Sequence, residues 1–311
     1  MSVSNAAEYV EEIGVTNEEF LEEALKSPEC PANFNSMYRY FCKYQKMAIE
    51  TLVEVSEIFN KNQIEYQLAY GSTLGAVRDG GQIPWDYDID LYVPFYEREK
   101  VEAALANDLD SKYFYCSPET TKDLNYRLSI VRVLPKGYCH QALHVDIFYI
   151  IGLPDGEEER TEYCKSVSEA VLSRKFTIQK LSEYPYPVRA KITQTIKSIQ
   201  YRFKYGKHAK DFNVEHFLKY DLHTATEADR INRHCGEEIM PAEWFLQSVD
   251  IETSIGTFKI TKYYEEYLTK YYGDWKGYPS IESRIAEVQK HCRQFKWYEH
   301  KVKQGKIKTV M

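Results

Sequence analysis

The segment Ile64–Val93 reads IEYQLAYGSTLGAVRDGGQIPWDYDIDLYV and contains two strand-like patterns joined by a turn and a short helix. Its first seven residues alternate apolar and polar side chains, which predicts a half-buried strand. Gly71 is expected to end this strand, and Ser72 to cap a helix over residues 73–78. A strand that leads into a helix leaves backbone N–H groups free at the turn. Gly71, Ser72 and Thr73 are therefore predicted to bind phosphate.

The second half of the segment carries three aspartates at alternate positions. Asp86, Asp88 and Asp90 share one face of a predicted strand, while the residues between them are apolar. Neighbouring carboxylates on such a face lie roughly 6.5 to 7 Å apart, and at an effective dielectric of about 20 each pair repels by roughly 2.5 kcal/mol. A hard cation with oxygen ligands offsets this repulsion, so the pattern predicts Mg²⁺ or Mn²⁺.

A later strand pattern, over residues 143–149, places Asp146 opposite its apolar face. Gly-Ser, Asp-x-Asp and a lone Asp on a later strand form the pattern of the nucleotidyltransferase superfamily. The strings YGSTLGAVRDGGQIPWDYDIDLYV (70–93) and HVDIFYIIGLPDG (144–156) are more specific, and they resemble the LicD family of phosphotransferases. The same core is similar to that of the fukutin-type ribitol-phosphate transferases.

This resemblance implies an α+β fold, with a nucleotidyltransferase-like mixed β-sheet core flanked by helices and a mostly helical C-terminal half. It also implies that Asp88 and Asp90 are the metal-binding pair, with Asp146 as the third carboxylate and as the general base. Asp86 is either a further metal ligand or a hydrogen-bond acceptor beside the site. Fifteen residues separate Ser72 from Asp88 and thirteen separate it from Asp86, so the identity of the pair stays open.

The resemblance names a reaction as well. A CDP-activated alcohol, most often CDP-choline, gives its phospho-alcohol to a sugar hydroxyl of a cell-surface glycan, teichoic acid or glycolipid precursor, and CMP is released. One alternative is a nucleotidyltransferase that uses the same metals to move a nucleoside monophosphate to a hydroxyl acceptor. A second alternative is a non-catalytic relative that binds phosphorylated glycans.

Two further residues are candidates for substrate binding. Arg78 could contact a phosphate through two charge-assisted hydrogen bonds, or it could pair with Asp79 or Glu99. Trp85 could supply an aromatic face to the quaternary nitrogen of choline. Arg127 and Arg132 could each reach a phosphate, but the preferred interpretation of both is a surface arginine on a strand. His140 and His144, which are close in sequence to Asp146, are interpreted as ordinary strand or loop histidines.

Composition limits the possible classes of function. The chain has 311 residues, a net charge of −7, 43% apolar and 28% charged residues, which indicates a globular protein and argues against a nucleic-acid partner. The start MSVSNAAEYVEE lacks the pattern of a signal peptide, and no run approaches the roughly 18 apolar residues of a membrane span. We therefore expect a cytoplasmic protein.

Three regions are predicted from these patterns. Residues 1–35 form an N-terminal helical extension, residues 36–155 the nucleotidyltransferase-like catalytic core, and residues 156–311 a mostly helical region that completes the active-site cleft. A long helix over residues 36–60 is expected to lead into the first strand.

The helix expected over residues 188–205 has an apolar stripe and a strongly basic composition. The apolar stripe contains Ile192, Ile196, Ile199 and Phe203, and no acidic residue occurs between Lys191 and Lys210. The preferred interpretation is an ordinary helix packed on the core with a solvated basic face. The alternative is a surface for anionic lipid, which would give peripheral contact with the cytoplasmic face of a membrane.

Overall fold

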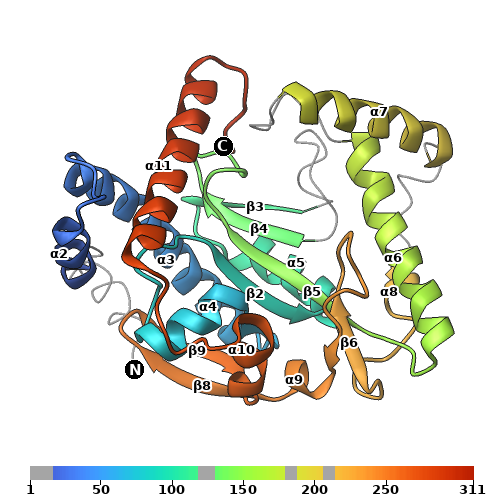
Figure 1. Ribbon diagram of the computed structural model, residues 1–311. Helices are drawn as coiled ribbons and strands as arrows, with labels where there is room; N and C mark the ends of the chain where they lie inside the picture. Colours follow the sequence, from blue (N-terminus) through green and yellow to red (C-terminus); the bar gives the residue numbers. More distant parts are fainter. Residues whose placement is uncertain (1–16, 118–129, 179–187, 206–213) are drawn as a thin grey trace.

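The computed structural model describes residues 17–117, 130–178, 188–205 and 214–311. A mixed sheet of seven strands forms its centre, in the order β1-β2-β5-β4-β3, with β6 pairing β5 and β7 pairing β6 (Figure 1). The strands of this sheet are β1 (Gln67–Leu68), β2 (Ile89–Pro94), β3 (Tyr113–Cys116), β4 (Ile130–Pro135), β5 (Val145–Gly152), β6 (Glu227–Arg230) and β7 (Met240–Pro241). A separate hairpin consists of β8 (Ser248–Thr253) and β9 (Gly256–Thr261).

Helices surround this sheet. The longer ones are α2 (Glu18–Lys26), α3 (Phe34–Lys61), α5 (Arg98–Asp108), α6 (Glu157–Ile178), α7 (Val188–Tyr205), α10 (Tyr264–Tyr272) and α11 (Ile281–Lys303). The short ones are α4 (Tyr70–Leu74), the π-helical turn η1 (Gly75–Asp79), the 3₁₀ turn η2 (Phe95–Glu97), α8 (Val214–Phe217) and α9 (Glu243–Leu246). Among the described helices, none combines the length and hydrophobicity that crossing a bilayer requires.

Strands β2 and β5 run parallel to each other in the middle of the sheet. Their register pairs Asp90 with Asp146 and Leu91 with Ile147, so equivalent side chains share a face. Leu91 and Ile147 are completely buried, and both strands contact α3. The predicted α+β class, with a mixed sheet flanked by helices, is confirmed.

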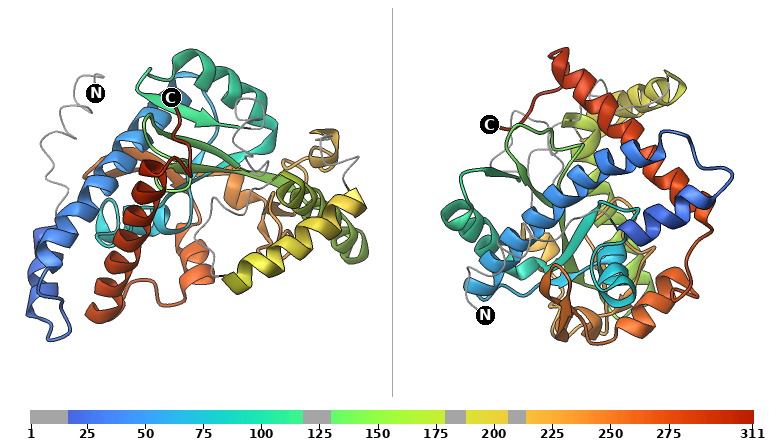
Figure 2. Two further views of the ribbon diagram at one scale, coloured as in Figure 1. Left: turned by 90° about the horizontal axis from the view of Figure 1, so that it is seen from above. Right: turned by 90° about the vertical axis from the view of Figure 1, so that its left-hand side faces the viewer.

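Helix α3 covers the apolar face of the sheet. It begins two residues before and ends one residue after the predicted range of 36–60. Its buried side chains recur every three or four residues, as an amphipathic helix requires, and include Phe41, Ala48, Leu52, Val55 and Phe59. Helix α11 lies beside α3, although more than 200 residues separate them in the chain (Figure 2).

The region after residue 155 contributes strands as well as helices. Strand β6 pairs with the end of β5, where Ile150 faces Arg230, and hairpin β8–β9 contacts the edge strand β1. In contrast, α6 and α7 pack against each other at the periphery (Figure 1). The predicted domain boundaries at residues 35 and 155 stay predictions. The central sheet contains strands from both sides of residue 155.

Candidate active site

One row of charged side chains crosses three neighbouring strands on the face opposite α3. The register places Arg132 of β4 beside Asp146 of β5, and Asp146 beside Asp90 of β2. Asp88 directly precedes β2 and lies at the same end of the sheet. The alternation of polar and apolar residues in both aspartate strands forces this arrangement, because their apolar side chains face the core.

This row lines a cavity of about 290 Å³. The lining residues come from β2, β4, β5, the segments that precede β2 and β5, and helix α11. They are Tyr87, Asp88, Asp90, Arg132, Gln141, His144, Asp146, Gln294 and Tyr298. Three of the four aspartates predicted as metal ligands therefore meet in one cavity. Helix α11, which belongs to the region 156–311 that was predicted to complete the cleft, supplies part of its wall.

Arg132 and Asp146 form a two-point ion pair. The Nε and Nη2 atoms of Arg132 donate to the two carboxylate oxygens of Asp146 over 2.6 and 3.1 Å, and Nη1 donates to the His140 carbonyl over 2.9 Å. Only 19% of the Arg132 side chain is exposed. The interpretation of Arg132 as an ordinary surface residue is therefore wrong. Arg127 lies outside the described residues.

His144 stands on the other side of Asp146. Its Nε2 lies 3.6 Å from an Asp146 carboxylate oxygen. Burial and then the nearby Arg132 charge lower the pKa of His144 to about 4, so its imidazole is neutral near pH 7. His144 is thus a neutral polar wall of the cavity, and the charge of Asp146 is balanced by Arg132.

Asp88 and Asp90 form no such ion pair within the described part of the chain, and they repel each other. The surrounding protein atoms, followed by the charges of Asp86 and Asp146, raise the pKa of Asp88 to about 7. Burial, followed by the charges of Asp146 and Asp88, raises the pKa of Asp90 well above its usual range. Each carboxylate would gain from a nearby cation, because a positive charge favours the ionised form.

Asp86 does not line this cavity. Its Oδ1 accepts a hydrogen bond from the Asp88 amide over 3.1 Å, so it shapes the turn that presents Asp88. A Cβ atom on Gly71 would lie 3.3 Å from Asp86 Oδ2, a closer approach than most side chains make. These contacts agree with a supporting role for Asp86, while its predicted role as a metal ligand stays a prediction.

The turn predicted to bind phosphate differs from the expectation. Strand β1 is shorter than predicted, and helix α4 begins at Tyr70 with Ala69 as its N-cap, so Ser72 is not the cap. The amides of Ser72 and Thr73 donate to the Ala69 carbonyl, over 2.9 and 3.3 Å. These N–H groups are therefore not free for phosphate, and the prediction of an open phosphate turn is corrected.

The side chains of this turn support the aspartate strand instead. Ser72 Oγ accepts from the Asp90 amide over 2.9 Å, and the Asp90 carbonyl accepts from the Ala69 amide over 2.9 Å. Thr73 is completely buried, and its hydroxyl donates to the Leu68 carbonyl over 2.6 Å. Ser72 was predicted to bind substrate, but its side chain fixes the backbone of Asp90.

Arg78 and Trp85 lie in a packed aromatic cluster rather than in the cavity wall. Arg78 pairs with Asp79 over 3.0 Å, its side chain is 8% exposed, and its guanidinium lies over Tyr278 and Trp85 at 4.8 and 5.7 Å. Trp85 is buried, and Arg284 covers it at 5.1 Å. Of the two interpretations of Arg78, the structure favours the ion pair with Asp79. Substrate binding by Arg78 and Trp85 finds no support in these contacts.

A second arginine, missed in the sequence, approaches the aspartates from β6. The Arg230 guanidinium lies over the rings of Tyr70 and Phe148 at 5.0 and 5.1 Å, and it pairs with Glu238 over 2.9 Å. Its positive charge partly offsets the rise in the pKa of Asp90. Among the described residues, the buried Nε of Arg230 has no hydrogen-bond partner. Its stretch of sequence has no strand-like alternation, so only the sheet pairing reveals it.

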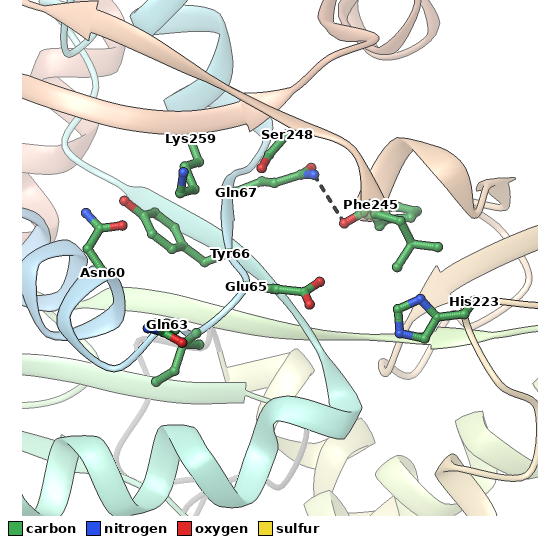
Figure 3. Close-up of a pocket in the computed structure, with 11 residues that line it drawn as sticks. Asn60, Gln63, Glu65, Tyr66, Gln67, His223, Phe245, Ser248 and Lys259 are labelled. Atoms are coloured by element: carbon green, nitrogen blue, oxygen red, sulfur yellow. Dashed lines mark hydrogen bonds between the residues drawn. The ribbon is translucent and has the colours of Figure 1, made fainter.

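A larger cavity, of about 520 Å³, lies along the edge strand β1 and contains none of the aspartates (Figure 3). Glu65, His223 and Lys259 are its ionisable side chains besides Tyr66, and the Gln67 amide donates to the Phe245 carbonyl across one wall. Because Glu65 is the single carboxylate in this lining, this cavity lacks the paired carboxylates that phosphoryl transfer with a divalent metal requires.

The aspartate cavity can be compared with the needs of a divalent cation. Within the described ranges, no three His, Cys, Asp or Glu side chains converge as a ready-made metal cluster. Both carboxylate oxygens of Asp146 accept hydrogen bonds from Arg132. The chemistry of Asp88 and Asp90 nevertheless fits a hard cation, since both are oxygen ligands whose pKa values are raised by the surrounding protein and by their mutual repulsion.

Comparison with known proteins places this site in a described domain. Residues 63–180 match the family model described as LicD/FKTN/FKRP, nucleotidyltransferase domain. Over 259 residues the chain is 26% identical to "Lipopolysaccharide cholinephosphotransferase LicD" of Haemophilus influenzae, and the alignment covers 77% of this chain and 92% of that relative. The row formed by Arg132, Asp146 and Asp90 lies inside the matched domain, whereas Arg230 lies beyond it.

Proposed function

Through residues 63–180 the chain belongs to the LicD family of phosphotransferases, and on this premise we propose that it transfers phosphocholine from CDP-choline to a sugar hydroxyl. CMP is the second product. The acceptor is a saccharide of a cell-surface glycan, a teichoic acid or a glycolipid precursor. Choline is proposed as the alcohol because the relative is named a lipopolysaccharide cholinephosphotransferase.

The observation that carries this proposal is the row of Arg132, Asp146 and Asp90, with Asp88 beside it. Phosphoryl transfer needs neutralisation of charge on the transferred group and in-line placement of the attacking and leaving oxygens. The three carboxylates of this cavity and the fixed Arg132 guanidinium supply groups for neutralising charge and for placing the reacting oxygens.

In this proposal Asp88 and Asp90 hold Mg²⁺ or Mn²⁺. When bound, the metal neutralises the phosphate oxygens and orients the diphosphate of the donor. Asp146 accepts the proton of the attacking sugar hydroxyl, and the two hydrogen bonds from Arg132 orient its carboxylate for that step. Neutral His144 adds no positive charge that would compete with Arg132 for the Asp146 carboxylate.

Arg230 is the second cationic group in the proposed mechanism. Its guanidinium is fixed by the rings of Tyr70 and Phe148 and by the carboxylate of Glu238. Its Nε–H has no hydrogen-bond acceptor among the described residues. A phosphate oxygen beside Asp90 would use this donor. Arg230 would then stabilise negative charge on the diphosphate as a second cationic group besides Arg132.

The proposal is tested by following the products. Purified protein is incubated with CDP-choline, Mg²⁺ and an oligosaccharide released from lipopolysaccharide, and CMP and the modified saccharide are measured by mass spectrometry. We expect release of CMP that depends on both acceptor and metal, with a phosphocholine mass added to the saccharide. Release of CMP without modification of any acceptor would contradict transfer.

A donor panel separates this proposal from the related nucleotidyltransferase reaction. CDP-ribitol, CDP-glycerol and the nucleoside triphosphates are each tested in place of CDP-choline. Transfer from CDP-ribitol or CDP-glycerol alone would correct the alcohol and keep the reaction type. Release of pyrophosphate from a triphosphate, with the nucleotide left on the acceptor, would replace the reaction while keeping the metal site, since the same carboxylates serve both.

A further inference from the structure

Helix α7 exposes the apolar stripe that an ordinary globular helix would bury. Ile192, Ile196, Ile199 and Phe203 are 58%, 53%, 51% and 89% exposed. The preferred interpretation of this stripe as core packing is therefore wrong. Four large apolar side chains on one helix exceed the scattered single exposures that are normal on a protein surface.

The stripe points away from the helix on which α7 packs. At about 100° per residue, the four stripe residues fall within an arc of roughly 60°. Gln194 and Ser198 lie on the opposite side of the helix and are half-buried and buried, respectively. α7 packs against α6 at the edge of the molecule (Figure 1). The amphipathic helix thus turns a polar face inward and its apolar face outward.

The charge of α7 selects the partner for this face. The helix contains five basic and no acidic residues, namely Arg189, Lys191, Lys197, Arg202 and Lys204. Arg189 and Lys197 are exposed, and Lys204 pairs with Glu169 of α6 over 3.6 Å. This basic excess occurs on a chain whose net charge is −7, so it is a local property of the helix.

A second copy of this chain is a poor occupant for the stripe. Pairing two α7 helices through their apolar faces would bring five positive charges of one helix close to five of the other. Like charges across an interface oppose association. An anionic bilayer surface satisfies both properties of α7, because apolar side chains enter the boundary between headgroups and acyl chains while lysines and arginines contact lipid phosphates.

We propose that α7 is a membrane-docking helix that lies in the plane of an anionic lipid surface, with Ile192, Ile196, Ile199 and Phe203 inserted among the lipids. Attachment is peripheral and reversible, since it uses one helix. The proposal rests on the exposed stripe and its charge, and it stands independently of the reaction proposed for the aspartate cavity. Docking would bring that cavity to acceptors that are anchored in lipid.

The test is co-sedimentation of the full chain with two kinds of vesicle, one of phosphatidylcholine alone and one containing 30% phosphatidylglycerol, a share of roughly one-third chosen to give a negative surface potential. We expect binding to the anionic vesicles at low salt and weaker binding at high salt. Ile196→Ser combined with Phe203→Ser should lower binding more than about tenfold. Arg189→Gln and Lys197→Gln should each lower it about fivefold.

A matched control uses α2, which also exposes an apolar and a basic residue side by side. Leu25→Ser combined with Lys26→Gln removes comparable groups, and it should leave vesicle binding unchanged. Circular dichroism of each variant reports whether the helices are retained. The vesicle readout needs no donor or acceptor, so its result is separate from that of the CMP assay.

Three outcomes would overturn the proposal. The first is absence of binding to anionic vesicles at low salt. The second is equal binding by wild type and by the variant with Ile196→Ser and Phe203→Ser. The third is a dimer in analytical ultracentrifugation that this same variant abolishes, because the stripe would then be the contact between two copies.

Discussion

The β2–β5 face of the sheet and helix α7 have equally regular patterns of apolar residues, but the protein uses them in opposite ways. In the sheet, Leu91 and Ile147 are buried and the polar side chains face a cavity. In α7, Ile196 and Phe203 face outward. The spacing of apolar residues therefore predicts which residues share a face of a strand or helix. The contacts of that strand or helix with the rest of the protein decide which face is buried.

The largest effect is expected from the aspartate pair. Asp90→Asn and Asp88→Asn each remove a ligand of the proposed metal, and we expect turnover to fall about 10³-fold or more, since metals contribute several kcal/mol to transition-state stabilisation. Each variant should stay folded, because the change also removes like-charge repulsion. Steady-state release of CMP measures the first effect, and thermal melting the second.

Asp250→Asn is the matched control for this pair. Asp250 is largely exposed and pairs with Lys259 on hairpin β8–β9, away from the cavity. Its replacement should leave turnover within about twofold of wild type, as is usual for surface substitutions. Wild-type turnover in both Asp88→Asn and Asp90→Asn would show that the active site lies elsewhere.

The next effect concerns the ion pair that anchors the row. Arg132→Gln removes the guanidinium that neutralises the poorly exposed Asp146 carboxylate, and we expect a loss of about 3 kcal/mol in the free energy of unfolding. Lys259→Gln breaks the more exposed pair with Asp250 and should cost less than about 1 kcal/mol. Urea denaturation measures both.

A double variant sharpens this contrast. Adding Asp146→Asn to Arg132→Gln removes the negative charge that Arg132 no longer neutralises, so part of the lost stability should return. If the double variant is as unstable as the sum of the two single variants, the two side chains do not interact as the geometry indicates. Turnover should stay low in all three variants, because Arg132 and Asp146 both serve the proposed reaction.

Much of the fold and of the aspartate site could be predicted because alternation is a local property. The strands around Asp90 and Asp146 and the long helix α3 each follow from the spacing of their own residues. That Asp90 and Asp146 are neighbours follows from their position on the polar faces of two strands. The family resemblance added their pairing with a metal, which is still a prediction.

The rest depends on contacts between distant segments. Ser72 is a residue type that often caps helices, but helix α4 begins two residues earlier, at Tyr70, and the Ser72 hydroxyl instead accepts from the distant Asp90 amide. Arg132 looks like any strand arginine until the register places it beside Asp146. Arg230 reaches Asp90 through pairing of β6 with β5, across more than 70 residues of sequence. No local pattern contains this information.

The pH dependence of stability tests the electrostatics of the aspartate face. A raised pKa means that the folded state of the metal-free protein binds more protons than the unfolded state between about pH 4 and the folded pKa of Asp88, about 7. Stability should therefore fall as pH rises through this window. Asp88→Asn should flatten the fall, and added Mg²⁺ should oppose it by binding the ionised carboxylates.

Melting temperatures measured from pH 4 to 8, with EDTA or with Mg²⁺, give this dependence directly. Asp250→Asn again serves as the control, and its profile should follow that of wild type. A wild-type stability that rises steadily from pH 4 to 7 in EDTA, with no difference in Asp88→Asn, would show that the carboxylates of the cavity do not repel one another.

The smallest effect is expected where the apolar pattern faces solvent. Ile196→Ser and Phe203→Ser should each change the free energy of unfolding by less than about 0.5 kcal/mol, because little apolar surface is lost from the interior and Ile, Phe and Ser have similar helix propensities. Leu52→Ala on α3 removes a buried side chain and should cost about 2 to 5 kcal/mol. Urea denaturation without lipid compares the three variants. A loss at Phe203 as large as that at Leu52 would mean that the stripe is packed in solution, and the contrast between the sheet face and α7 would disappear.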